Sequence, residues 1–151
     1  MDAVTYPNRK VIDFLQNKLI PLQLGANDEP YASDYGVKWT PNLLIIDAEG
    51  KVYHSAVGFL EPLEFIPWLL LGMGKASFGK DNFKEALECF ESVNTEYSFS
   101  CSAPEAIYFR GVSQYKSTHQ PEGLKKACRI LQERYPGSEW AKRAYPYWLI
   151  P

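Results

Sequence analysis

The spacing of apolar residues changes near residue 61, and this change constrains the fold more than any other feature of the chain. Before it, short apolar runs separated by turn residues favour strands and one helix. After it, apolar residues recur every three or four positions to the C-terminus, which is typical of amphipathic helices. The pattern predicts a front half that mixes helix and strand and a second half made of helices.

The second half is divided into helices by groups of Gly, Pro, Asn and Ser residues. The predicted helices cover residues 62 to 78, 83 to 93, 104 to 116, 122 to 135 and 139 to 148. Because the connecting segments are short, consecutive helices are expected to lie antiparallel. We expect a boundary near residue 70, with one domain over residues 1 to 70 and a second over residues 71 to 151.

The residue pattern of the front half predicts a helix, a strand and a hairpin. The helix covers residues 9 to 19, with Asn8 as its N-cap. The strand covers residues 19 to 24 and belongs at a sheet edge, because Pro21 cannot donate a ladder hydrogen bond. The hairpin covers residues 43 to 57, and its first strand is apolar at every position, as in a strand covered on both faces.

Charge and hydropathy exclude several classes of partner. The chain has 16 basic and 18 acidic residues, so it lacks the excess of positive charge typical of nucleic-acid-binding proteins. The longest apolar run is interrupted by Pro67 and is shorter than the roughly 20 residues of a membrane span. With no secretory signal at its start, the chain as given is expected to be cytoplasmic, or periplasmic if a signal precedes Met1.

The cysteines and histidines form no recognisable site. The spacings between Cys89, Cys101 and Cys128 are 12 and 27 residues, which match no zinc or redox motif. Cys89 and Cys128 lie at apolar helical positions, whereas Cys101 lies in a loop and is a candidate reactive thiol. The only histidines, His54 and His119, make no ligand motif. Neither a metal nor a cofactor is expected.

Residues 35 to 65 contain the loop Trp39-Thr40-Pro41, two hairpin strands and the start of a helix. This segment resembles the second half of the thioredoxin fold. In that family the peptide bond before the equivalent proline is cis, and the backbone of the preceding residue pairs with an extended substrate. The resemblance therefore implies a peptide-binding loop at Trp39, Thr40 and Pro41, with Trp39 adding apolar contact. The alternative is a structural loop whose Trp39 packs under the hairpin.

The chain departs from that family in one decisive respect. It has no Cys-x-x-Cys pair, which thioredoxin-like enzymes use for redox chemistry. Residues 1 to 24 resemble the helix and strand that follow this pair, so the central strand of the family is missing as well. The sheet could rearrange, another chain could supply the strand, or the chain could be truncated. We expect a truncated piece of a longer protein that begins upstream of Met1.

The helical half resembles degenerate tetratricopeptide (TPR) repeats, in which small residues let paired helices approach and aromatic residues fill the space between them. About two units are present. The residues that carry the resemblance are Gly74, Phe83, Ala86 and Phe90 in the first unit, Gly111, Tyr115 and Ala127 in the second, and Ala141 and Ala144 after it.

The expected class is therefore α/β plus all-α, an incomplete thioredoxin-like sheet with a TPR-like antiparallel helical array. The expected function is a protein-binding module without thiol-disulfide catalysis in this chain. The alternative is a thiol-disulfide oxidoreductase of the disulfide isomerase type, serving cell redox homeostasis, whose Cys-x-x-Cys lies upstream of Met1. The expected partner is a protein or peptide, or a second copy that dimerises through the incomplete sheet or the helical repeats.

Overall fold

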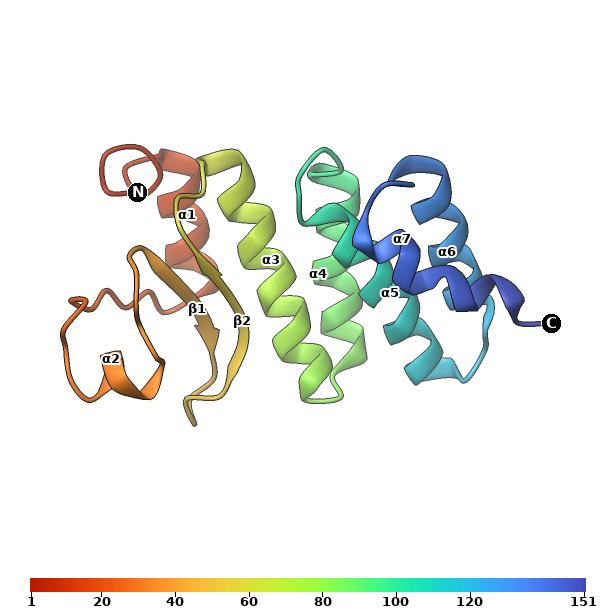
Figure 1. Cartoon of the computed structure of the whole chain (residues 1–151), viewed down its shortest axis with the longest axis horizontal. Helices are drawn as coiled ribbons and strands as arrows, with labels where there is room; N and C mark the ends of the chain where they lie inside the picture. Colours follow the sequence, from red (N-terminus) through yellow and green to blue (C-terminus); the bar gives the residue numbers. More distant parts are fainter. The chain divides into compact units, whose positions relative to one another are not determined.

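The computed structural model describes all residues from Met1 to Pro151. They form two compact units, Met1–Ile66 and Pro67–Pro151, and helix α3 (Pro62–Gly79) crosses the division between them. Most of the chain is helical, and the remainder includes one small antiparallel sheet (Figure 1). None of the helices has the length and apolar character needed to cross a lipid bilayer.

The first unit begins with the predicted helix, α1 (Arg9–Lys18), and the short helix α2 (Tyr31–Asp34) follows. The N-cap of α1 is confirmed, because Asn8 Oδ1 accepts hydrogen bonds from the backbone N–H groups of Lys10 (3.0 Å) and Val11 (3.4 Å). The apolar stripe of α1 is anchored by Val11, which is fully buried. Local capping and one buried face therefore account for this helix.

The predicted hairpin is confirmed as strands β1 (Asn42–Ile46) and β2 (Val52–Val57), which pair antiparallel with Asn42 opposite Val57. The turn is held by the carboxylate of Asp47, whose Oδ1 accepts from the N–H of Glu49 (3.2 Å) and of Lys51 (2.9 Å). Gly50 takes a φ of 81°, in the region that favours glycine. The turn residues thus fix where the hairpin reverses.

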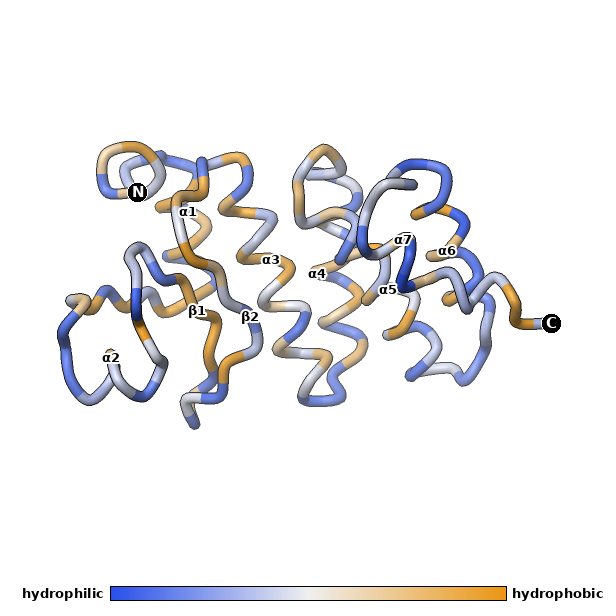
Figure 2. Tube along the Cα trace, in the orientation of Figure 1, coloured by the Kyte–Doolittle hydropathy of each residue, from blue (hydrophilic) through white to orange (hydrophobic).

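Two predictions for the first unit were wrong. Residues 19 to 24 form no strand, because the sheet has only two strands and neither pairs with this segment. The side chain of Ile20 is 97% exposed. The segment Leu43 to Ile46 is not covered on both faces, since only Ile45 is buried and Ile46 is 43% exposed. Figure 2 shows the apolar colouring of β1 along its length.

The second unit contains the rest of α3 and the helices α4 (Phe83–Glu96), α5 (Ala103–Thr118), α6 (Glu122–Arg134) and α7 (Glu139–Ala144). The predicted helices are confirmed except at the C-terminus, where a 3-10 helix, Tyr145–Leu149, follows α7. Pro146 has no N–H to continue the α-helical hydrogen bonding, which explains the change. Helix α5 packs against both α4 and α6.

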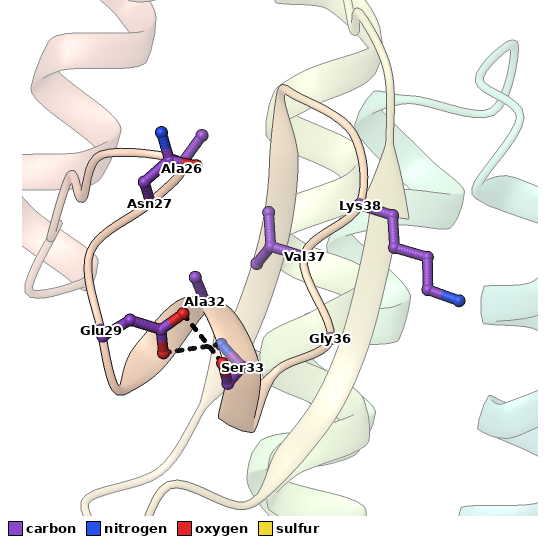
Figure 3. Close-up of a pocket in the computed structure, with 8 residues that line it drawn as sticks. All are labelled: Ala26, Asn27, Glu29, Ala32, Ser33, Gly36, Val37 and Lys38. Carbon is purple, nitrogen blue, oxygen red and sulfur yellow. Dashed lines mark hydrogen bonds between the residues drawn. The ribbon is translucent and has the colours of Figure 1, made fainter.

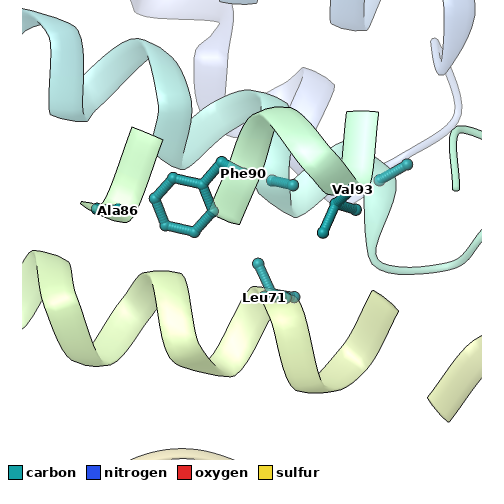
Figure 4. Packing of buried hydrophobic residues seen from close by; sticks show 6 residues of the cluster. Leu71, Ala86, Phe90 and Val93 are labelled. Atoms are coloured by element: carbon teal, nitrogen blue, oxygen red, sulfur yellow. The ribbon is translucent and has the colours of Figure 1, made fainter. Parts of the chain in front are cut away.

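Helix packing in the second unit depends on two glycines that face larger groups. Phe90 is fully buried in a cluster with Leu71, Ala86 and Val93 (Figure 4). A Cβ atom on Gly74 would lie 2.5 Å from Cε1 of the Phe90 ring. On α5, a Cβ atom on Gly111 would lie 2.6 Å from the Cβ of Ala127 and 2.8 Å from the carbonyl oxygen of Gly123. The helices therefore approach closely because these positions lack side chains.

Polar contacts connect the helices of the second unit beside this apolar core. Lys75 of α3 pairs with Glu105 of α5 at 2.8 Å, and Arg110 of α5 pairs with Glu91 of α4 at 2.6 Å. The side chains of Lys75 and Glu105 are largely buried. Buried ion pairs gain little net stability, so the Lys75–Glu105 pair is expected to add little to the free energy of unfolding.

Candidate peptide-binding site

The predicted loop of Trp39, Thr40 and Pro41 leads directly into β1. The Thr40–Pro41 bond is cis, as expected, and the Glu29–Pro30 bond is cis as well. The carbonyl oxygen of Pro41 accepts a hydrogen bond from the N–H of Gly58 (2.9 Å), which extends the hairpin pairing by one residue. This bond holds the loop at the end of the hairpin where β1 begins and β2 ends.

Three exposed apolar residues belong to the segments that meet at this end of the hairpin. Trp39 is 72% exposed, Val57 is 62% exposed and Phe59 is 57% exposed. The pairing of Asn42 with Val57 brings the segments that contain them together. We refer to Trp39, Val57 and Phe59 as the hairpin-end patch. At this exposure, Trp39 does not pack under the hairpin.

The hairpin-end patch offers apolar contact and no reactive group. Its side chains have no nucleophile or titratable group, and Thr40 beside it has only a weakly nucleophilic hydroxyl. Exposed apolar surface of this kind is a recognised mark of an interaction surface. The sequence identified Trp39 but missed Val57 and Phe59, because strand patterning does not tell which face stays uncovered.

None of the cysteines is in a disulfide, and they differ in exposure. Cys101 is exposed in the turn between α4 and α5, whereas Cys89 is half-buried and Cys128 is fully buried. Burial raises the pKa of the Cys128 thiol above its ordinary value, and a hydrogen bond with the backbone of Trp148 opposes this shift. Cys101 is thus the accessible thiol, and Cys128 is a core residue.

We expect the thiols to react in this order of exposure. Because the thiolate is the attacking species, a buried thiol with a raised pKa should react slowly. With Ellman's reagent at neutral pH, Cys101 should give the fastest phase, and Cys128 should react only when the protein unfolds. The variant Cys101→Ser should lose the fast phase alone. A rapid reaction at Cys128 in the folded protein would contradict the burial described above.

The other titratable candidates do not assemble into a site. His54 lies on β2 opposite Ile45, and His119 caps α5 in the left-handed conformation with a φ of 59°. No group of three His, Cys, Asp or Glu side chains is placed to hold a metal ion. Gly74 and Gly79, which share the spacing of a phosphate loop, lie within α3. Helical backbone there leaves no loop to surround a phosphate.

Aromatic side chains on the helices mostly form a packed network. Tyr108 stacks on Tyr147, and their hydroxyl groups are 2.8 Å apart. Burial, followed by this hydrogen bond, raises the pKa of Tyr147 well above its ordinary value. Trp140 also packs against Tyr108. Exposed aromatic residues such as Phe99 and Trp148 lie outside this network.

A pocket of about 300 Å³ lies beside α2 in the first unit (Figure 3). The carboxylate of Glu29 is engaged by Ser33, through the hydroxyl at 2.8 Å and the backbone N–H at 3.3 Å. Figure 3 shows the Lys38 side chain pointing away from the other lining residues. The lining residues are Ala26, Asn27, Glu29, Ala32, Ser33, Gly36, Val37 and Lys38. The Ser33 hydroxyl donates to the Glu29 carboxylate, but the lining contains no histidine or cysteine to complete a nucleophile–base–orienter arrangement.

Comparison of the chain with protein-family models, with curated proteins and with solved structures found no match.

Proposed function

We propose that this chain is a protein-binding module that takes up an extended protein segment at the hairpin-end patch. The proposal includes a thioredoxin-like front unit and a TPR-like helical unit. The observation that carries it is Trp39, a large apolar side chain left 72% exposed next to the loop that the thioredoxin resemblance marks for peptide binding. A partner would cover this side chain and remove its apolar surface from water.

The chemistry of the patch indicates what kind of segment it binds. Trp39 and Phe59 expose aromatic rings, and Val57, the last residue of β2, exposes an aliphatic side chain. Such a surface suits a partner segment with apolar or aromatic side chains. The backbone of Thr40, which is exposed, can pair with an extended chain and fix its direction. We therefore propose an unfolded or extended apolar segment as the ligand.

Removing the Trp39 side chain should weaken this binding strongly. Truncation of a central aromatic residue in an interface costs roughly 2 kcal/mol, which is about 30-fold in Kd. The assay is an array of overlapping peptides from reduced, carboxymethylated ribonuclease, followed by fluorescence anisotropy with the strongest binder. We expect Trp39→Ala to lose about this much affinity.

The matched control is Trp148→Ala. Trp148 is 62% exposed, close to the value for Trp39, but it lies in the C-terminal 3-10 helix. This variant should bind the peptide as the unaltered chain does. Equal losses for Trp39→Ala and Trp148→Ala, or no peptide bound above background, would overturn the proposal.

A thiol-disulfide oxidoreductase is the second candidate. One observation favours it: residues 19 to 24 and one edge of β1 lack a neighbouring strand. Further strands could therefore extend the sheet of the first unit. The activity would depend on thiols that precede Met1, because exchange needs a reactive thiol pair. The chain as given should not accelerate the reduction of insulin by dithiothreitol. Acceleration that Cys101→Ser abolishes would instead assign catalysis to Cys101.

A further inference from the structure

The alternation of backbone hydrogen bonds in the hairpin determines which residues of β1 direct their N–H and C=O groups away from β2. The N–H of Gly58 donates to the carbonyl of Pro41 at one end, and the N–H of Asp47 donates to the carbonyl of Lys51 at the other (3.2 Å). Residues in an antiparallel pair alternate between bonded and non-bonded positions. Pro41 and Asp47 therefore face β2, and the alternate residues 42, 44 and 46 direct their N–H and C=O groups away from it.

This outer edge of β1 lacks two of the features that keep sheet edges from pairing. Natural edge strands are protected by charged side chains, proline or a covering element. The strand Asn42–Ile46 contains no charged residue and no proline, and no other strand lies beside it. The side-chain Oδ1 of Asn42 is also buried without a hydrogen-bond partner. The isolated hairpin thus leaves hydrogen-bonding capacity unused along this edge.

We propose that two copies of the chain pair through this edge, with β1 antiparallel to β1 of the partner about a two-fold axis at Leu44. In this register Leu44 lies opposite its own copy, and Asn42 lies opposite Ile46 of the partner subunit. These are the residues whose backbone groups face outward, so each pair can exchange two hydrogen bonds. The contact would convert two hairpins into one continuous four-stranded sheet, in the order β2-β1-β1-β2.

A second copy can occupy this edge because the edge is complementary to itself. An isologous contact places each residue opposite its symmetry-related position. With no ionisable side chain in β1, no like charges meet across the axis. The proposed dimer uses β1 backbone groups and not the side chains of the hairpin-end patch. It therefore does not rest on the proposed peptide binding.

The first test uses the unaltered protein. Sedimentation equilibrium should show a mass that rises with concentration from monomer to dimer. Hydrogen exchange measured at low and at high protein concentration should show slower exchange of the Leu44 and Ile46 amides in the concentrated sample. A monomer at every concentration, or exchange at these amides that does not change when a dimer forms, would overturn the proposal. A protein that stays monomeric at every concentration would leave the outer edge of β1 available to a strand of another protein.

The second test places a charged side chain at Leu44, on the proposed two-fold axis. Leu44→Lys and Leu44→Glu should each be monomeric, because like charges would lie directly opposite each other. Mixing the two variants should restore a dimer. Val52→Lys and Val52→Glu are the control on the other strand, since Val52 lies opposite Ile46 on β2, away from the axis. Val52 is 41% exposed, whereas Leu44 is half-buried. Loss of the dimer in the Val52 variants alone would place the contact on the other strand and overturn the proposal.

Discussion

Phe90→Ala is expected to lower the free energy of unfolding by roughly 3 to 5 kcal/mol, the range found when a buried phenylalanine is truncated. Phe90 is fully buried and packs with Leu71 and Val93 (Figure 4). Its loss removes the transfer free energy of the ring and leaves a cavity, because the neighbouring helices can collapse only partly. Urea denaturation followed by circular dichroism measures the change.

A substitution at Gly74 tests its close contact with the Phe90 ring. Gly74→Ala alone should also destabilise the protein, since the new Cβ would meet the Phe90 ring at 2.5 Å. In the Phe90→Ala background the obstacle is gone, and alanine is a better helix former than glycine by roughly 0.5 to 1 kcal/mol. Gly74→Ala should therefore become neutral or stabilising there. Additive effects of the two substitutions would show that Gly74 and Phe90 are not in contact.

Gly111→Ala is expected to lower the free energy of unfolding by roughly 1 to 3 kcal/mol, the usual cost of overpacking. The added Cβ would lie 2.6 Å from the Cβ of Ala127 and 2.8 Å from the carbonyl oxygen of Gly123. The second obstacle is backbone, so α5 and α6 would have to move apart. Adding Ala127→Gly should recover only part of the loss, because the Gly123 carbonyl remains. Thermal and urea denaturation both measure this change in stability.

Gly137→Ala is the control for Gly111→Ala. Gly137 lies between α6 and α7, and nothing lies within 4 Å of the position of an added Cβ. This substitution should be neutral or stabilise by about 0.4 to 1 kcal/mol, because alanine restricts the unfolded chain more than glycine does. If Gly137→Ala and Gly111→Ala destabilised the protein equally, close approach of the helices could not be the cause.

Local signals in the sequence were sufficient for the helices and the hairpin. The spacing of residues such as Ala86 and Phe90 marks a buried helix face, and Asn8 and Asp47 specify a cap and a turn through their own side chains. The C-terminal change to a 3-10 helix was not predicted, although Pro146, which removes an N–H from the ladder, was a local signal for it. These features depend on near neighbours in the chain, which the sequence displays directly.

The features that the sequence did not predict depend on distant partners. Residues 19 to 24 have the composition of a strand, but a strand requires a neighbour, and nothing in its own residues reveals that none is present. Likewise Ile46 and Val57 read as ordinary apolar strand residues, and their exposure follows from the small size of the sheet. The hairpin-end patch could be assembled only from the pairing register of the two strands.

Binding at the hairpin-end patch is measured most directly by following the indole N–H signals of the four tryptophans by nuclear magnetic resonance during titration with the array peptide that binds most strongly. Trp68 is buried, and Trp148 is exposed far along the chain from the hairpin-end patch, so both serve as internal references. If the peptide binds at the patch, the Trp39 signal should shift or broaden in proportion to the bound fraction while the signals of Trp68 and Trp148 stay in place. A saturating titration that moves the Trp148 signal and leaves Trp39 unchanged would contradict binding at the patch.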